Sequence, residues 1–164
     1  MVRIGIISDT HYHLDDKIFK YLEECDEIWH AGDIGSLEVA DRLAAFKTLR
    51  AVYGNIDNHE IRNVHPLIQR FDCENVDVLI KHIGGYPGKY DSSIKNTMRI
   101  NPPKLFISGH SHILKIQYDQ KYDLLHINPG AAGKNGFHNV RTLVRLTIDG
   151  KEMKDLEVVE LGKR

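Results

Sequence analysis

One pattern constrains the fold of this chain more than any other. Five times, a short apolar run ends in a cluster of Asp, Asn or His residues, usually with glycine. The five pairs of run and cluster are Ile4–Ser8 with Asp9-Thr10-His11, Ile28–Ala31 with Gly32-Asp33, Ala51–Tyr53 with Gly54-Asn55-Ile56-Asp57, Val78–Lys81 with His82-Ile83-Gly84, and Leu105–Ser108 with Gly109-His110-Ser111-His112. Short apolar runs are typical of strands buried on both faces, and ligands gather beyond the carboxyl ends of such strands. The pattern therefore predicts strands whose ends meet at one site.

The spacing between these runs predicts the fold class. The first half reads as strand, helix, strand, helix, strand over Val2–Ile7, 17–24, Glu27–His30, Leu37–Phe46 and 49–53, with Ser36 as the N-cap of the second helix. The second half is richer in strands, which we expect at 76–80 and 105–108 and in two hairpins, 113–118 with 124–127 and 141–148 with 157–161, with a polar helix or loop near 92–99. We expect an α/β (α+β) protein with two packed sheets, helices outside them, and a single domain over residues 1–164.

Composition excludes several classes of protein. Lys and Arg number 22 against 23 Asp and Glu, a net charge of -1 that argues against a nucleic-acid partner. No apolar run approaches the roughly 20 residues of a membrane span, and two cysteines without C-x-x-C spacing suit a cytoplasmic location. Self-association stays open, so a homo-oligomer is not excluded. The ten histidines are unusually many, and histidine is the commonest metal ligand.

The polar residues after the strands form a candidate metal-ligand set. Its members are Asp9, His11, Asp33, Asn55, His82, His110 and His112. Nitrogen and oxygen ligands without cysteine favour Mn, Fe, Ni or Zn over calcium and over a structural thiolate zinc site. Seven ligands exceed one tetrahedral shell, whereas two ions about 3.5–4 Å apart that share one carboxylate would use all of them. The set therefore predicts a dinuclear centre.

The order D-x-H, G-D, G-N, H, G-H-x-H resembles that of the calcineurin-type metallophosphoesterases. The chain length and Asn128-Pro129-Gly130-Ala131 are similar to the small single-domain phosphodiesterases of that family, over residues 3 to about 148. The resemblance implies a four-layer α-β-β-α sandwich. It also implies that Asp9, His11 and His112 hold one divalent ion and that Asn55, His82 and His110 hold the other, with Asp33 bridging both. Mn²⁺ is the first expectation, with Ni²⁺, Fe²⁺ or Zn²⁺ as alternatives.

The same resemblance implies the reaction. A hydroxide bridging the two ions attacks a small phosphoester, which makes the chain a metal-dependent hydrolase. Many family phosphatases carry a histidine directly after the Asn of G-N, where it helps to protonate the leaving group, but this chain has Ile56. Diesters and activated esters are therefore favoured over phosphomonoesters. The acidic residue two positions after Asn is kept as Asp57, which we assign to the catalytic set with Asp33 and Asn55.

Other departures from the family pattern lie at the rim. Tyr12 replaces the usual glycine after D-x-H, and it is followed by His13, a candidate contact for substrate phosphate. The Pro-Arg pair that follows Asn-Pro-Gly in the family is missing, and 133–137 occupies that region. Of the remaining histidines, we expect His30 to be buried and hydrogen-bonded and His126 to occupy a sheet position.

Two other functions stay open at this stage. The retromer scaffold subunit is similar to this family and acts as a protein-binding surface, and Ile56 keeps such a scaffold role in view. The intact ligand set argues against it, because a scaffold does not need those side chains. A nuclease is the weaker alternative, because the Lys and Arg residues are scattered and form no basic groove.

Overall fold

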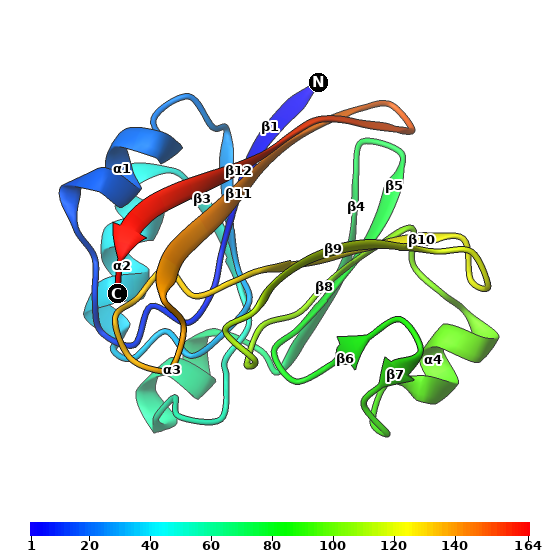
Figure 1. The fold of residues 1–164 in the computed structure, drawn as a ribbon, viewed down its shortest axis with the longest axis horizontal. Helices are drawn as coiled ribbons and strands as arrows, with labels where there is room; N and C mark the ends of the chain where they lie inside the picture. Colours follow the sequence, from blue (N-terminus) through cyan, green and yellow to red (C-terminus); the bar gives the residue numbers. More distant parts are fainter.

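Two five-stranded sheets stand face to face at the centre of the computed structural model, which describes residues 1–164 (Figure 1). In order across the first sheet, the strands are β12 (Glu152–Lys163), β11 (Val140–Asp149), β1 (Val2–Ile7), β2 (Glu27–His30) and β3 (Thr48–Ala51). In order across the second sheet, they are β4 (Ile68–Cys73), β5 (Val76–Lys81), β8 (Leu105–Ile107), β10 (Leu124–Pro129) and β9 (Leu114–Asp119). Both sheets mix parallel and antiparallel pairs.

Four helices and a small hairpin complete the fold. They are α1 (Asp16–Leu22), α2 (Leu37–Phe46), α3 (His59–Val64), α4 (Lys95–Ile100), and the pair β6 (Gly85–Tyr86) with β7 (Lys89–Tyr90). Ser36 caps α2 as predicted, because its hydroxyl accepts from the backbone N–H of Val39 at 3.4 Å. Asp15 caps α1 in the same way through the N–H of Ile18.

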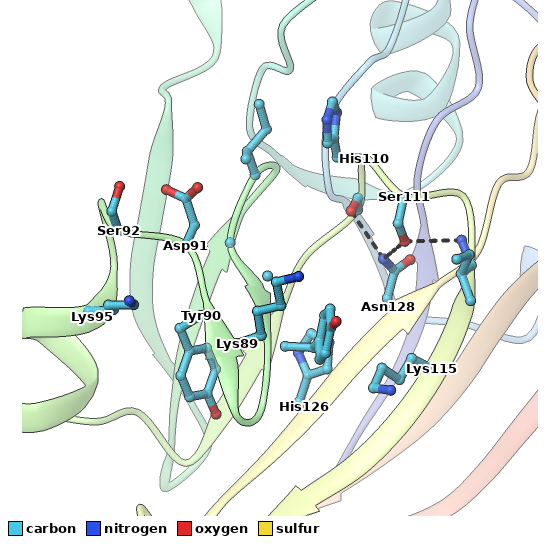
Figure 2. A pocket seen from close by; sticks show the side chains of 16 residues that line it. Lys89, Tyr90, Asp91, Ser92, Lys95, His110, Ser111, Lys115, His126 and Asn128 are labelled. Atoms are coloured by element: carbon cyan, nitrogen blue, oxygen red, sulfur yellow. Dashed lines mark hydrogen bonds between the residues drawn. The ribbon is translucent and has the colours of Figure 1, made fainter.

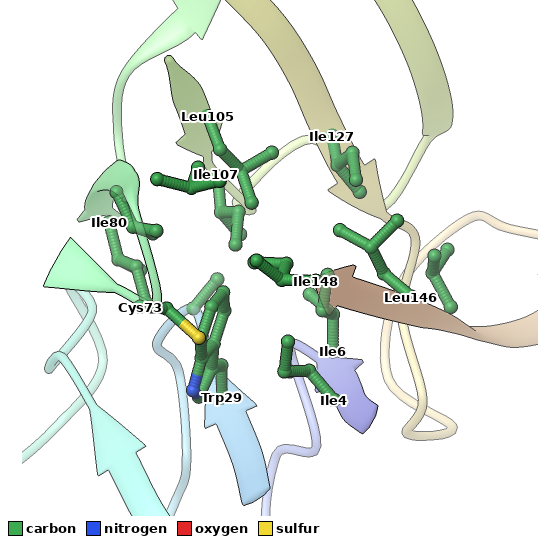
Figure 3. Packing of buried hydrophobic residues seen from close by; sticks show 14 of the residues in the cluster. Ile4, Ile6, Trp29, Cys73, Ile80, Leu105, Ile107, Ile127, Leu146 and Ile148 are labelled. Atoms are coloured by element: carbon green, nitrogen blue, oxygen red, sulfur yellow. The ribbon is translucent and has the colours of Figure 1, made fainter. Parts of the chain in front are cut away.

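Three apolar clusters lie between four layers, in the order helices, first sheet, second sheet and helix. This order confirms the predicted α-β-β-α arrangement. The central cluster fills the space between the sheets, where Ile6 of β1 and Trp29 of β2 pack with Ile80 and Ile107 from the opposite sheet (Figure 3). A second cluster joins α1, α2 and α3 to the outer face of the first sheet. A third seats Met98 of α4 with Phe106 on the outer face of the second sheet. Each sheet therefore buries both faces, which explains its near-continuous apolar strands.

Four elements have no counterpart in the predictions: β4, α3 and the short strands β6 and β7. The strand β4 pairs only with β5 and alternates half-buried and exposed residues, so its polar side chains hide the strand pattern. Helix α3 was not predicted, because Ile61 is the only buried residue of its six and the helix has no apolar face to read. The strand β12 begins at Glu152, five residues before the predicted start. Its first half is charged and mostly exposed, so the sequence pattern did not indicate a strand there.

No helix of the structure has both the length and the apolar character needed to cross a lipid bilayer.

Candidate metal centre

The carboxyl ends of five strands bring the predicted ligands together. Asp9 follows β1, Asp33 follows β2, Asn55 follows β3, His82 follows β5, and the His110–His112 segment follows β8. Two groups of side chains each bring together one ligand atom per residue, with all of these atoms within 4.8 Å of one another. The first group is Asp9, His11, Asp33 and His112, and the second is Asp33, His82 and His110. Only Asp33 belongs to both groups. The structure thus places this carboxylate between two ligand clusters.

Asn55 completes the second cluster. Its Oδ1 atom lies 3.0 Å from Nδ1 of His110 and 3.2 Å from Nε2 of His82. All seven residues of the candidate set therefore contact another member of the set. Amide oxygen is a common ligand of hard and borderline divalent ions, so Asn55 is suited to the role that the sequence pattern predicts.

Backbone hydrogen bonds hold the loops that carry these ligands. The N–H of Asp9 donates to the carbonyl of Gly32 at 2.9 Å, and the N–H of His11 donates to the carbonyl of Asp33 at 3.1 Å. The N–H of Gly109 similarly donates to the carbonyl of His82 at 3.0 Å. The first contacts join neighbouring loops of one sheet and the last joins neighbouring loops of the other. The ligand geometry is thus built by the ends of the sheets.

The ligand loops adopt a costly backbone conformation. Nine non-glycine residues have positive φ, and five of these are candidate ligands: Asp9, His11, Asp33, His110 and His112. Such left-handed residues cluster at functional sites, where surrounding contacts hold them. The backbone at Gly54 lies against the Asp33 side chain, and only glycine allows this contact. A Cβ at Gly54 would lie 2.0 Å from Oδ1 of Asp33. Packing and backbone conformation together hold Asp33 at the centre.

Hydrogen bonds select the nitrogen that each histidine presents. Nδ1 of His82 lies 2.7 Å from the carbonyl oxygen of Ala31, which can only accept, so Nδ1 carries the proton. The lone pair of Nε2 then faces Oδ2 of Asp33, 3.2 Å away. His11 also points Nε2 at this oxygen, at 3.3 Å, and its Nδ1 accepts from the amide NH₂ of Asn135 at 3.0 Å, which orients the ring. Donation by the far nitrogen, as at His82, is typical of histidines in metal sites.

The centre concentrates charge in a buried place. Burial alone would raise the pKa of Asp9, but the neighbouring imidazoles of His11 and His112 outweigh it and hold the pKa below its ordinary value. Burial is outweighed in the same way at Asp33, whose pKa is lowered by His11 and His82. The neighbouring carboxylates of Asp33 and Asp9 raise the pKa of His11 to about 9. Both carboxylates are thus ionised at neutral pH and need a cation beside them.

Two buried atoms in the centre lack a partner. Oδ1 of Asp9 and Nε2 of His11 make no hydrogen bond, although both are shielded from solvent. Buried polar atoms are normally satisfied, so an unpaired carboxylate oxygen next to an unpaired imidazole nitrogen calls for an explanation. A divalent cation bound by both atoms would supply it. The residues present therefore fit the metal that their chemistry predicts.

Asp57 lies behind this centre. It is buried, and its carboxylate accepts from three backbone N–H groups: those of Gly54 at 2.7 Å, Gly35 at 2.9 Å and Ile34 at 3.2 Å. These bonds tie the loop of Asp33 to the loop of Asn55. The contacts of Asp57 therefore favour a positioning role over contact with the reacting atoms.

Two rim residues also have defined contacts. Nε2 of His13 lies 3.1 Å from Oδ2 of Asp15, so this side chain is paired with the cap of α1. Its contact with substrate stays a prediction. The side chain of Ile56 is 38% exposed, whereas its backbone N–H donates to Oδ1 of Asp33 at 3.1 Å. Ile56 thus contributes its backbone to the centre while its side chain supplies no proton.

Three residues that contact the candidate ligands were not predicted from the sequence. Ser8 donates to Oδ2 of Asp9 at 2.6 Å, Asn135 contacts His11, and the ring of His138 packs edge-on against His112 with centroids 5.3 Å apart. Ser8 directly precedes a ligand, so its position was a usable signal. The loop that carries Asn135 and His138 lies far along the chain and offers no such local signal.

Comparison with known proteins places this geometry in a family. The model of the calcineurin-like phosphoesterase superfamily domain matches residues 2–151. The chain belongs to this superfamily. The match includes every candidate ligand, so the family order of motifs and the observed cluster describe the same residues.

Relatives and solved structures agree with that placement. A probable metallophosphoesterase of Methanothermobacter thermautotrophicus is 27% identical over 97% of this chain and 92% of its own length. A phosphodiesterase of Methanocaldococcus jannaschii is 30% identical over 79% of this chain and 83% of its own. The crystal structure of Vps29 from Entamoeba histolytica complexed with zinc superposes with a TM-score of 0.73 at 17% identity, over 96% and 98% of the two chains. The Vps29 likeness shows a shared fold.

Proposed function

We propose that the chain is a phosphodiesterase that depends on two divalent metal ions. The observation that carries this proposal is the position of Asp33, the one side chain common to both ligand clusters. Asp9, His11 and His112 would hold one ion, and Asn55, His82 and His110 the other. We assign Mn²⁺ as the preferred ion; the zinc in the Vps29 structure supports a divalent ion in this fold.

The bound ions would lower the pKa of a water molecule to make the nucleophile and would neutralise charge on the phosphate oxygens. The chain's own residues prepare that chemistry. His82 keeps its Nε2 lone pair inward by donating from Nδ1, and the ring of His11 is oriented by the amide of Asn135. Asp57 holds the loops of Asp33 and Asn55 together by accepting three N–H groups.

The leaving group distinguishes diesters from monoesters. A general acid in the active site typically contributes about 10²–10⁴-fold to the rate, and a histidine after Asn55 would be placed to act as one. Ile56 has no proton to give. Substrates with a good leaving group depend least on that proton, so we infer that activated esters and diesters are better substrates than natural phosphomonoesters. The relative named as a phosphodiesterase is consistent with this choice.

The test is hydrolysis of bis(4-nitrophenyl) phosphate by chelator-treated protein with and without added Mn²⁺. We expect Mn²⁺ to restore activity and His110→Ala to lower it by at least about 100-fold. His59→Ala is the matched control, because His59 is an exposed histidine at the start of α3, outside both clusters. Full activity in His110→Ala would contradict the assigned centre.

A protein-binding scaffold is the second candidate, and the Vps29 likeness is the observation that favours it. It predicts a chain that hydrolyses no phosphoester with Mn²⁺, Zn²⁺, Ni²⁺ or Fe²⁺ bound. The two ligand clusters argue against it, since a binding surface gains nothing from buried, unpaired ligand atoms.

A further inference from the structure

A cavity of about 610 Å³ opens beside the candidate metal centre. Figure 2 shows His110, a ligand of the second cluster, at one end of it, and Tyr90 and Lys95 at the other. The β6–β7 hairpin, the start of α4 and the strands β9 and β10 line the space between. This volume is typical of pockets for small organic ligands, and it exceeds what one phosphate group needs. A substrate bound at the metal centre could thus extend past His110 into the cavity.

The cavity is lined by an excess of positive charge. Lys89 of β7, Lys95 of α4 and Lys115 of β9 contribute ammonium groups, against the single carboxylate of Asp91. None of these three lysines forms an ion pair. The lysine side chains that do form ion pairs are those of Lys104 and Lys154. The ammonium of Lys115 lies 4.7 Å from the ring centroid of Tyr86. Unpaired lysines that line one concave space favour an anionic ligand.

His126 supplies a second, independent feature. Its side chain is 1% exposed and lines the cavity, and Nδ1 lies 3.2 Å from the carbonyl oxygen of Phe106. Because that oxygen can only accept, Nδ1 carries the proton, and Nε2 is an acceptor that has no partner. Burial lowers the pKa of His126 to about 4, which keeps the ring neutral. The cavity therefore holds a buried acceptor that lacks a donor.

The polar neighbour of His126 is already satisfied. The amide nitrogen of Asn128 donates to the carbonyl of Gly109 and to the hydroxyl of Ser111, both at 3.1 Å (Figure 2). Its oxygen accepts from the N–H of Gly130 at 3.0 Å. Asn128 thus holds the loop on both sides of His110, and His126 remains for a ligand.

We propose that this cavity binds a second phosphate of the substrate, carried by an ester substituent that also bears a hydroxyl group. The substrate class is a phosphodiester of a phosphorylated sugar or nucleoside. The reacting phosphate lies at the metal centre, the second phosphate contacts Lys89 and Lys115, and a hydroxyl donates to Nε2 of His126. This inference rests on the proposed function, since it places one phosphate on the ions.

Calorimetry on Mn²⁺-loaded protein tests the proposal without turnover. The probes are inorganic phosphate, fructose 6-phosphate against fructose 1,6-bisphosphate, and adenosine 5′-monophosphate against adenosine 3′,5′-bisphosphate. We expect at least one bisphosphate to bind about tenfold more tightly than its monophosphate, and the pair with the larger ratio identifies the sugar or the nucleoside. The double variant Lys89→Ala, Lys115→Ala should reduce that ratio to less than twofold.

Two further variants separate the cavity from general charge effects. Lys20→Ala, Lys151→Ala removes the same charge at exposed positions that do not line the cavity and should keep the ratio. His126→Phe should weaken bisphosphate binding about threefold or more and leave inorganic phosphate unchanged. Equal binding of mono- and bisphosphates, or an unchanged ratio in the cavity variant, would overturn the cavity proposal alone. Failure of every phosphate to bind would contradict the metal centre as well.

Discussion

Oδ2 of Asp33 lies 3.2 Å from Nε2 of His82, and this contact joins the two sheets. Asp33 follows β2 of the first sheet, and His82 follows β5 of the second. The ligand clusters therefore depend on how the sheets pack as well as on each loop. We therefore expect a change at either residue to lower metal affinity and, through it, the stability of the folded chain.

Replacing Asp33 with Asn should remove the shared ligand. We expect Mn²⁺ affinity to fall by about 100-fold or more, because an amide lacks the negative charge and the second equivalent oxygen of a carboxylate. Thermal unfolding with increasing Mn²⁺ measures this, since a ligand of the native state raises the midpoint in proportion to its binding. Asp72→Asn, an exposed position on β4, is the matched control. An unchanged response in Asp33→Asn would contradict the bridging role.

Replacing Asp57 with Asn tests positioning against catalysis. One of its two oxygens becomes an amide NH₂, so at least one of the three buried N–H groups it now satisfies loses its acceptor. We expect the free energy of unfolding to fall by about 2–4 kcal/mol, measured by urea denaturation of metal-free protein. A catalytic residue without a positioning role would behave differently: activity would be lost while stability and Mn²⁺ affinity stayed at the wild-type values.

Placing a histidine at position 56 should add the missing proton donor. We expect Ile56→His to raise hydrolysis of phosphomonoesters about tenfold or more relative to bis(4-nitrophenyl) phosphate, measured as a ratio of kcat/KM. The Ile56 side chain is partly exposed, so the substitution fits without repacking. Ile56→Gln controls for polarity, because its amide does not donate a proton at neutral pH. An equal ratio in both variants would remove Ile56 as the reason for diester preference.

His126 should make stability depend on pH in a defined window. Its pKa is about 4 in the native state against about 6.5 unfolded, so the unfolded chain binds more protons between these values. The free energy of unfolding therefore rises with pH from about 4 to 6.5, with up to about 3 kcal/mol from this residue. His126→Phe should flatten the curve there, as measured by denaturation at several pH values. Parallel curves for both proteins would contradict a buried, neutral His126.

Strand ends were the most informative part of the sequence. The apolar runs before Asp9, Asp33 and His82 are continuous because both faces of each sheet are covered, so they were readable without knowledge of the neighbouring strands. Glycine beside a polar residue then located the candidate ligands. His30 also behaves as predicted: it is buried, with Thr10 2.9 Å from its Nε2 atom.

Contacts between segments far apart in the chain could not be predicted from the sequence in this way. Asn135 reaches His11 across 124 positions, and nothing in the local sequence of either residue indicates that pairing. The edge strand β4 and the short α3 were missed because their buried residues are few and separated by charge. The sequence pattern of Asp57 matched a catalytic motif, yet its three backbone partners became visible only in the folded chain.

The central claim is that two ions share Asp33, and anomalous diffraction from crystals grown with Mn²⁺ tests it most directly. We predict two anomalous peaks about 3.5–4 Å apart, both within bonding distance of the Asp33 carboxylate, one beside His11 and the other beside His82. A single peak, or peaks that Asp33 does not contact, would contradict the account.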